Sequence, residues 1–231
     1  MILVPNIPLG TQLTEAPLHA DEIRETERGI RRSQAELGNE MKSCLGDSMT
    51  RTRYKIYNDQ QPHFLTLTVV EWIPLFANPD IATIIFQSLR FVKRERGMIL
   101  YAYVIMEHHL HLIASAPELA KTMKEFKSFT ARTIIDYLEE RNSIPLLSKL
   151  KKAKLLHKKE SDYQLWQEGN HPEEICSEQM LIQKIKYIHN NPVRRGYVEE
   201  AKHWRYSSAR NYEGMEGVLE VCADWRNGAQ I

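Results

Sequence analysis

The middle of the chain contains an apolar stretch that also carries histidines, Tyr103-Val104-Ile105-Met106-Glu107-His108-His109-Leu110-His111-Leu112-Ile113-Ala114. Its apolar and β-branched residues are typical of a buried β-strand. Side chains alternate between the faces of a strand, so His109 and His111 point one way while His108 points the other. Two imidazoles on a rigid strand are half of a divalent-metal site, and they are equally typical of hydrogen-bonded histidines at a sheet surface.

The flanking sequence alternates between strand and helix patterns. Strands are predicted over residues 63–70, 98–104 and, as a short segment, 163–167; helices are predicted over 81–95, 118–140 and from 180 to about 189, where Asn191-Pro192 ends the last one. This order predicts a small α+β sandwich, with a sheet that carries its helices on one face.

The length of 231 residues suits one globular domain with an appendage, and the 42% hydrophobic content is enough for a core. Residues 1–48 are charged and poor in aromatics, which predicts a flexible or loosely helical extension. We expect the domain to occupy residues 49–215, with Met49 a candidate start, and residues 216–231 to form a tail.

The sequence has no transmembrane-length apolar run and no signal-peptide pattern, so we expect no membrane partner. The cysteines are odd in number and scattered, at Cys44, Cys176 and Cys222. They form no disulfide framework, and a reducing cytoplasm is the expected compartment.

Charge is balanced overall, with a formal net charge of +1, but it is unevenly distributed. Between residues 121 and 159, eleven Lys and Arg residues face four acids. A local basic patch is the expected footprint of phosphate binding, and a solvated helix face is the ordinary alternative.

A second informative string lies nearer the C-terminus, over residues 184–198. Tyr187 and Asn191 are four residues apart, so they share one side of a helix. A tyrosine hydroxyl is a poor nucleophile at its ordinary pKa near 10, but a metal and positive charge can activate it. The alternative is a core tyrosine in a helix that ends at Asn191-Pro192 and turns at Gly196.

Together these strings resemble the REP-associated tyrosine transposases, which are single-tyrosine HUH transposases. HUH stands for His-hydrophobe-His, matched by His109-Leu110-His111. The family string Tyr-Ile-x-x-Asn-Pro-Val-Arg/Lys-x-Gly-x-Val is matched without a gap by residues 187–198. Its Trp-x-x-Ser-Ser/Thr string is matched by residues 204–208, and the resemblance runs from about Tyr54 to Tyr212.

The resemblance implies a ferredoxin-like antiparallel sheet with the HUH string on a central strand and the tyrosine helix beside it. It implies His109 and His111 as metal ligands, Tyr187 as nucleophile and Asn191 as a third ligand or a helix cap. The metal would be Mg²⁺ or Mn²⁺. The implied reaction is cleavage and joining of single-stranded DNA through a 5′-phosphotyrosine, on hairpin-forming repetitive palindromes.

Basic and aromatic residues near these strings are candidate DNA contacts. The basic candidates, which would make binding salt-dependent, are Lys124, Lys127, Arg132 and the run 149–159, together with Arg194, Arg195 and Arg210. The last three could instead cap a helix end. Trp166, Trp204 and Tyr206 could stack on bases or pack in the core.

Three features depart from the family pattern or compete with it. Glu107 and His108 stand where Pro and Asn are common, and residues 141–162 look like a basic insertion. Tyr137 is a rival nucleophile, but Asp136 and Glu139 give it no cationic surroundings. A non-catalytic DNA- or RNA-hairpin-binding protein and a structural metal protein remain alternatives, and the sequence leaves the oligomeric state open.

Overall fold

The computed structural model describes residue 56 and residues 61–157, 161–169 and 172–225. The predicted extension over residues 1–48 and Met49 therefore lie outside the described residues. The elements are β1 (His63–Thr68), η2 (Val70–Trp72), η3 (Leu75–Ala77), α2 (Pro79–Glu95), β2 (Ile99–Ile105), β3 (His109–Ser115), α3 (Leu119–Glu140), α4 (Ile144–Lys152), β4 (Glu173–Glu174), α5 (Glu178–Arg194), η4 (Ala201–His203) and α6 (Ala209–Tyr212).

One antiparallel sheet organises these elements, with the strand order β2-β3-β1-β4. Helix α2 connects β1 to β2, and α3 with α4 connects β3 to β4, which is the β-α-β-β-α-β pattern of a ferredoxin-like fold. The predicted fold class is confirmed, and β3, which carries His109 and His111, is a central strand.

The stretch that opened the sequence analysis is a hairpin and not a single strand. Strand β2 ends at Ile105 and β3 begins at His109, and the Met106 N–H donates to the His109 carbonyl at 2.8 Å. Glu107 and His108 form the turn. The prediction that His108 points away from the histidine pair assumed an unbroken strand, and it is wrong for this reason.

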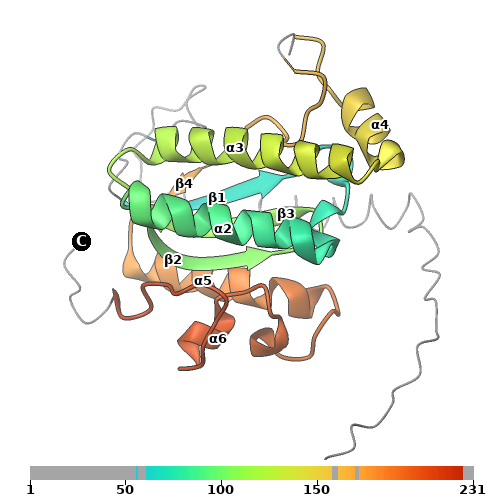
Figure 1. Ribbon diagram of the computed structural model, residues 1–231. Helices are drawn as coiled ribbons and strands as arrows, with labels where there is room; N and C mark the ends of the chain where they lie inside the picture. The colour runs from blue at the N-terminus through green and yellow to red at the C-terminus, as the bar shows by residue number, and fades with distance from the viewer. Residues whose placement is uncertain (1–55, 57–60, 158–160, 170–171, 226–231) are drawn as a thin grey trace, which may run out of the picture. The chain divides into compact units, whose positions relative to one another are not determined.

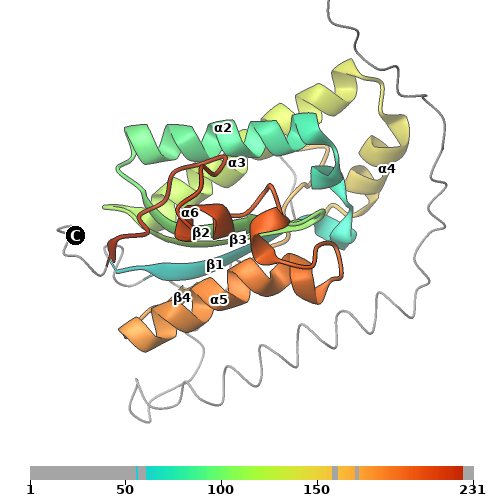
Figure 2. The same cartoon turned by 90° about the horizontal axis from the view of Figure 1, so that it is seen from below.

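The two faces of the sheet bury different helices. Leu110 and Leu112 of β3 belong to a core shared with α2 and α3, whereas Ile113 belongs to a second core shared with α5. Figures 1 and 2 show α2 and α3 on one face of the sheet and α5 on the other. The prediction that the helices lie on one face is correct for α2 and α3. It is wrong for α5, because the apolar residues of this helix are buried against the opposite face of the sheet.

The helix ends follow local chemistry. Asn78 accepts the Asp80 N–H at 2.9 Å at the start of α2, and Ser177 accepts the Met180 N–H at 3.2 Å at the start of α5. Pro192 lies inside α5, which continues to Arg194. The prediction that Asn191-Pro192 ends this helix is wrong, because a proline in the last turn removes only one helical hydrogen bond. Gly196, with φ +72°, follows the actual end.

The prediction of a short strand over residues 163–167 is also wrong. Trp166 makes an isolated bridge with Val69, and the Val70 N–H donates to the Leu165 carbonyl at 2.9 Å. The segment therefore attaches to the chain just beyond β1. The edge pairing with β1 is made by the two-residue strand β4.

Two further segments fall where the sequence predicted an insertion and a tail. The insertion over residues 141–162 contains α4, which Figure 1 shows beyond the C-terminal end of α3. The tail predicted from residue 216 contacts the domain: the Arg90 guanidinium donates to the Val218 carbonyl at 2.7 Å, and the Cys222 N–H donates to the Leu100 carbonyl at 2.8 Å. Within the described residues, no helix combines the length and the apolar character needed to span a bilayer.

Leu112→Ala is expected to lower the free energy of unfolding by about 2–5 kcal/mol, because it leaves a cavity beneath the helices. Leu112 is 0% exposed at the centre of the sheet, whereas Leu156 is 97% exposed. Leu156→Ala is the matched control, for which we expect a change within about 0.5 kcal/mol. Urea denaturation measures both, and similar losses for the two variants would contradict this core assignment.

Candidate active site

The site begins with the two histidines of β3. His109 pairs in register with Thr68 of β1 and His111 pairs with Thr66, on the face that α5 covers. The two imidazole centroids are 4.7 Å apart. Both residues are buried, at 3% exposure each, so a rigid central strand presents two imidazoles side by side beneath a helix.

Tyr187 of α5 meets this pair. Its ring centroid lies 5.5 Å from that of His111 in an edge-on arrangement, and 5.9 Å from that of Phe64 on β1. The helix and the strand that carry the two sequence strings therefore come together in space. Asn191 lies one turn further along α5 and is partly buried.

Each histidine has its Nδ1 atom engaged by a neighbour. Nδ1 of His111 is hydrogen-bonded to Thr66 Oγ1 at 2.9 Å, and Nδ1 of His109 is hydrogen-bonded to Nδ1 of His108 at 2.9 Å. These contacts leave Nε2 of both rings as the atoms available to a ligand. His108 therefore lies beside His109, where its own ring is packed edge-on against Trp72.

Burial keeps both imidazoles neutral. It holds the pKa of His109 well below its usual 6.5, with smaller effects of His111, His108 and Arg195 in the same direction. It also lowers the pKa of His111 to about 3, helped by the positive charge of Lys184. Neutral imidazole is the form that binds metal ions.

Two basic residues of α5 lie near the ring pair of Tyr187 and Phe64. The buried Lys184 ammonium is paired with Glu173 and lies 4.6 Å from the Phe64 ring centroid, while the Arg194 guanidinium lies 5.8 Å from the Tyr187 ring centroid. Arg194 is exposed, so a phosphate group that approached Tyr187 would meet its charge directly, whereas the charge of the buried Lys184 is balanced by Glu173.

Arg195, at the end of α5, contacts the turn that precedes β3. Its Nη1 lies 3.2 Å from Glu107 Oε1. Burial opposes ionisation of Glu107, but the hydrogen bond from His108 and the nearby charges of His108 and Arg195 outweigh it and lower the pKa of Glu107 to about 2. An ionised carboxylate therefore joins the tyrosine helix to the histidine turn.

The donor set fits an open, incomplete metal site. Neutral imidazoles favour first-row transition ions over Mg²⁺, and an amide oxygen such as that of Asn191 suits Mg²⁺ or Mn²⁺. Among the described residues, His, Cys, Asp and Glu side chains nowhere gather in a group of three or more. The protein would thus leave coordination positions to phosphate oxygens and water, unlike a closed structural zinc site.

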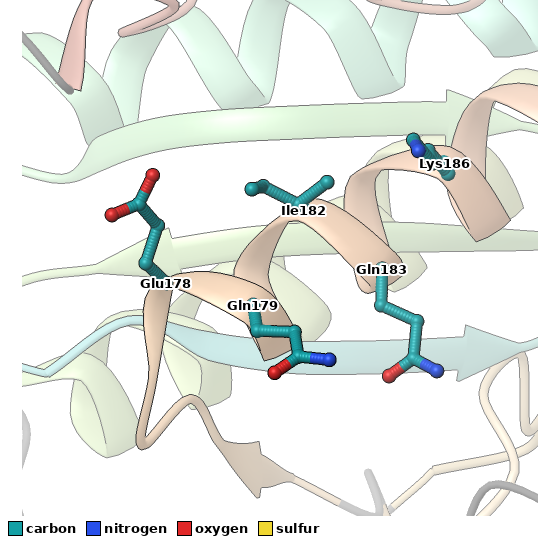
Figure 3. Close-up of a pocket in the computed structure, with 5 residues that line it drawn as sticks. All are labelled: Glu178, Gln179, Ile182, Gln183 and Lys186. Atoms are coloured by element: carbon teal, nitrogen blue, oxygen red, sulfur yellow. The ribbon is translucent and has the colours of Figure 1, made fainter.

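The depression drawn in Figure 3 is separate from this site. It lies over the outer side of the first turns of α5, where Glu178, Gln179, Ile182, Gln183 and Lys186 line it. None of the histidines of β3 takes part in it.

Comparisons with known proteins show a likeness of fold and of part of the sequence. No family model matches the chain. A curated Haemophilus influenzae protein that is named as a REP-associated tyrosine transposase is 29% identical over 107 residues, which are 46% of this chain and 56% of that protein. The chain thus spans little more than half the length of this relative. The solved structure of a REP-associated tyrosine transposase bound to a REP hairpin matches with a TM-score of 0.53 at 17% identity, over 76% of this chain and 93% of that chain.

Part of the chain is thus similar in sequence to a protein named as a REP-associated tyrosine transposase. At 17% identity the solved structure shows the likeness of fold, and the curated relative adds a likeness of sequence. The three strings singled out in the sequence have separate places in this fold. The first lies on β3, the second forms the last half of α5 and the segment after it, and the third runs along β2.

The third family string anchors the tyrosine helix. Ser208 Oγ donates to the Tyr103 carbonyl at 3.2 Å and is bonded to His189 Nε2 of α5 at 2.8 Å. The Trp204 indole N–H donates to the Ile105 carbonyl at 3.0 Å. Trp166 is buried in the core and Tyr206 packs against it, so both make the core contacts that the sequence left as an alternative to base stacking.

The candidate DNA contacts divide into two groups. Arg194 and Arg195 lie beside the site, on α5 and just after it. Lys124, Lys127 and Arg132 lie on α3, which covers the opposite face of the sheet, and Arg210 lies on α6. Lys127 and Arg195 already have internal partners, the Gln167 carbonyl at 3.2 Å and Glu107.

The rival nucleophile Tyr137 is far from the histidines in the fold. It lies on α3, where its hydroxyl donates to Asp80 Oδ2 at 2.7 Å. Sequence reasoning missed Thr66, Lys184 and Trp72, which contact the site residues. The only sequence signal for Thr66 is its polar position in an apolar strand, and the pairing register that sets it opposite His111 is not readable from sequence.

Lowering the pH is expected to destabilise the protein partly through His189. Burial lowers the pKa of His189 to about 4. Since an unfolded histidine has a pKa near 6.5, the unfolded chain binds more protons between these values, and the free energy of unfolding falls as pH falls through this window. His189→Gln should reduce the slope of the free energy of unfolding against pH by ~1.4 kcal/mol per pH unit, which corresponds to the loss of one titrating proton. Urea denaturation across this pH range tests it, and equal slopes would refute it.

Proposed function

We propose that the protein is a transposase that cleaves and rejoins single-stranded DNA, with Tyr187 as its nucleophile. The observation that carries the proposal is the approach of the Tyr187 ring to His111, which joins two distant sequence strings in one buried site. The relationship to the REP-associated tyrosine transposases gives this arrangement its reaction class.

In the proposed reaction the Tyr187 hydroxyl oxygen attacks the scissile phosphorus. The new bond joins the tyrosine oxygen to phosphorus, and the bond to the 3′-oxygen breaks. The tyrosine loses its proton to solvent, and the departing 3′-oxygen takes one up. The product is a 5′-phosphotyrosine with a free 3′-hydroxyl, and attack by a second 3′-hydroxyl reverses the exchange and joins strands. The number of phosphoester bonds stays constant, so the cycle needs no nucleotide cofactor.

His109 and His111, with Asn191, would hold a divalent ion, Mg²⁺ or Mn²⁺. When bound, such an ion supplies positive charge to the phosphate oxygens of the substrate. Arg194 adds positive charge near Tyr187, which favours both the phosphate and the ionised tyrosine oxygen.

The proposed substrate is a DNA hairpin of the repetitive-palindrome type. The support is indirect: the solved structure with the related fold is of a REP-associated tyrosine transposase bound to a REP hairpin. A hairpin offers a duplex stem and an adjacent single strand, and only the single strand is free to enter a buried site.

A covalent-adduct assay tests the reaction. A labelled single-stranded hairpin is incubated with the protein and Mn²⁺ or Mg²⁺, then analysed under denaturing conditions. A protein–DNA band that survives denaturation is expected. Stable hairpin binding without any adduct, with every metal and hairpin tried, would instead support a non-catalytic hairpin-binding protein.

The basic α4 segment is expected to contact the DNA backbone. The Gln164 N–H donates to the Leu150 carbonyl of α4 at 3.4 Å, and the next residue, Leu165, accepts from the Val70 N–H. The Val69 N–H, one residue earlier, donates to the His108 carbonyl at 2.9 Å. These contacts place α4 at the same end of the sheet as the histidines. Its exposed cations are Lys149, Lys151 and Lys152.

Replacing Lys149, Lys151 and Lys152 together by Gln should weaken hairpin binding and flatten its salt dependence. Each lost phosphate contact reduces the slope of log affinity against log salt by about 0.7–0.9. Lys121→Gln is the control, because that exposed lysine is already paired with Glu118. Fluorescence anisotropy at several salt concentrations measures the slope, and an unchanged slope in the triple variant would exclude α4 from the interface.

A further inference from the structure

The turn before β3 contains the two residues that depart from the family pattern, Glu107 and His108, and both contact the site. His108 Nδ1 is 2.9 Å from His109 Nδ1, and His108 Nε2 is 3.0 Å from Glu107 Oε1. The three side chains form a continuous chain of hydrogen bonds that ends on a candidate metal ligand.

Hydrogen-bond chemistry limits where the protons along this chain can lie. The ionised Glu107 carboxylate can only accept, so the proton between it and His108 lies on His108 Nε2. When His108 carries no second proton, its Nδ1 is an acceptor and His109 Nδ1 is the donor. A neutral His109 has one ring proton, so its Nε2 keeps a bare lone pair.

We propose that Glu107 and His108 are positioning residues that hold the His109 ring with Nε2 free to bind a cation. This inference rests on the proposed function, in which His109 is a metal ligand. Metal-bound histidines are commonly oriented through their other ring nitrogen by a carboxylate or carbonyl. Here a second histidine stands between the carboxylate and the ligand.

The surroundings hold this chain of hydrogen bonds in place. The Val69 N–H donates to the His108 carbonyl at 2.9 Å, and the Phe76 N–H donates to the Glu107 carbonyl at 2.8 Å. The Trp72 ring lies 4.9 Å from that of His108. Trp72 has a φ of +54°, a conformation that costs a bulky residue free energy and is retained where the surrounding packing requires it.

Arg195 extends the chain of hydrogen bonds to the tyrosine helix. Its Nη1 donates to Glu107 Oε1 at 3.2 Å, while its Nη2 lies further away, 3.4 Å from His108 Nε2. The shorter contact of His108 Nε2 is with the carboxylate, which agrees with the proton assignment. One carboxylate thus orients both the histidine turn and the segment that follows Tyr187.

Nitrogen-15 NMR of the histidine side chains in metal-free protein tests the inference directly. In the wild type we expect His109 to carry its proton on Nδ1, with Nε2 unprotonated. His108→Phe removes the acceptor and should abolish this preference. His108→Asn supplies an amide oxygen that accepts the same proton and should restore it. A wild-type His109 protonated on Nε2 would overturn the inference, whatever the variants do.

Manganese affinity supplies the second measurement, by titration of the full chain with Mn²⁺ alone. His108→Phe should bind Mn²⁺ about 10–100-fold more weakly than the wild type, and His108→Asn should recover most of this loss. Equal affinities of His108→Phe and the wild type would refute the positioning role. If the wild type binds no Mn²⁺, the proposed metal site is refuted. The NMR result still decides the proton assignment in that case. Thermal unfolding of each variant checks that it is folded.

Discussion

Tyr187→Phe is expected to abolish the covalent protein–DNA adduct and to reduce strand cleavage by about a thousand-fold or more. The substitution removes only the hydroxyl oxygen that forms the bond to phosphorus, and the reaction has no other path to a covalent intermediate. The ring itself remains to pack against Phe64 and His111. Binding of the hairpin should therefore change little, and denaturing electrophoresis with a labelled hairpin separates the two effects.

Tyr137→Phe is the matched control for this prediction. Tyr137 also lies on a helix, but its hydroxyl donates to Asp80 on the face of the sheet away from the histidines. Adduct formation should persist in this variant. An adduct that survived Tyr187→Phe and disappeared in Tyr137→Phe would move the nucleophile to α3 and would refute the site described above.

His109→Ala and His111→Ala are each expected to slow cleavage by about a hundred- to a thousand-fold. Such factors correspond to the several kcal/mol that a bound divalent ion contributes to charge stabilisation in a transition state. Both variants should also lose most of their Mn²⁺ affinity. Hairpin binding, which depends on basic residues elsewhere, should remain within a few-fold of the wild type.

The same pair of variants tests the metal assignment separately from the nucleophile. If cleavage persisted at the wild-type rate without either imidazole, the metal assignment would be wrong even though Tyr187 could still be the nucleophile. Each variant leaves a cavity at a buried position, so its melting temperature has to be compared with that of the wild type before a loss of activity is interpreted.

Much of the fold was predictable because the strands and helices carry strong periodic patterns. The HUH strand, α2 and α3 lie where apolar spacing placed them, and the central position of β3 agrees with the family resemblance. The hairpin turn at Glu107 and His108 was not predictable, because an apolar stretch on both sides of it reads as one strand. The position of α5 on the second face was equally hidden, since periodicity identifies an apolar side but not its partner.

The residues of the site could be predicted from the sequence, but the contacts between them could not. The motif strings singled out His109, His111 and Tyr187, and the fold brings these side chains together. Thr66 and Lys184 escaped notice because their roles depend on strand register and on the packing of α5. Arg195 was predicted as a DNA contact or a helix cap from its charge and its place near the motif strings. Its ion pair with Glu107 depends on how the chain folds back after α5.

The third family string has a consequence for solubility as well as for the site. Strand β2 is the outermost strand on its side of the sheet, and an uncovered row of N–H and carbonyl groups is a template for pairing with another chain. Here the Ile105 N–H donates to the Tyr206 carbonyl at 2.8 Å, and the Ser208 N–H donates to the Tyr103 carbonyl at 3.0 Å. A protein truncated between α5 and Trp204 would keep every residue of the proposed chemistry. Its β2 edge would nevertheless be exposed and could pair with the same edge of another molecule, which would lead to aggregation.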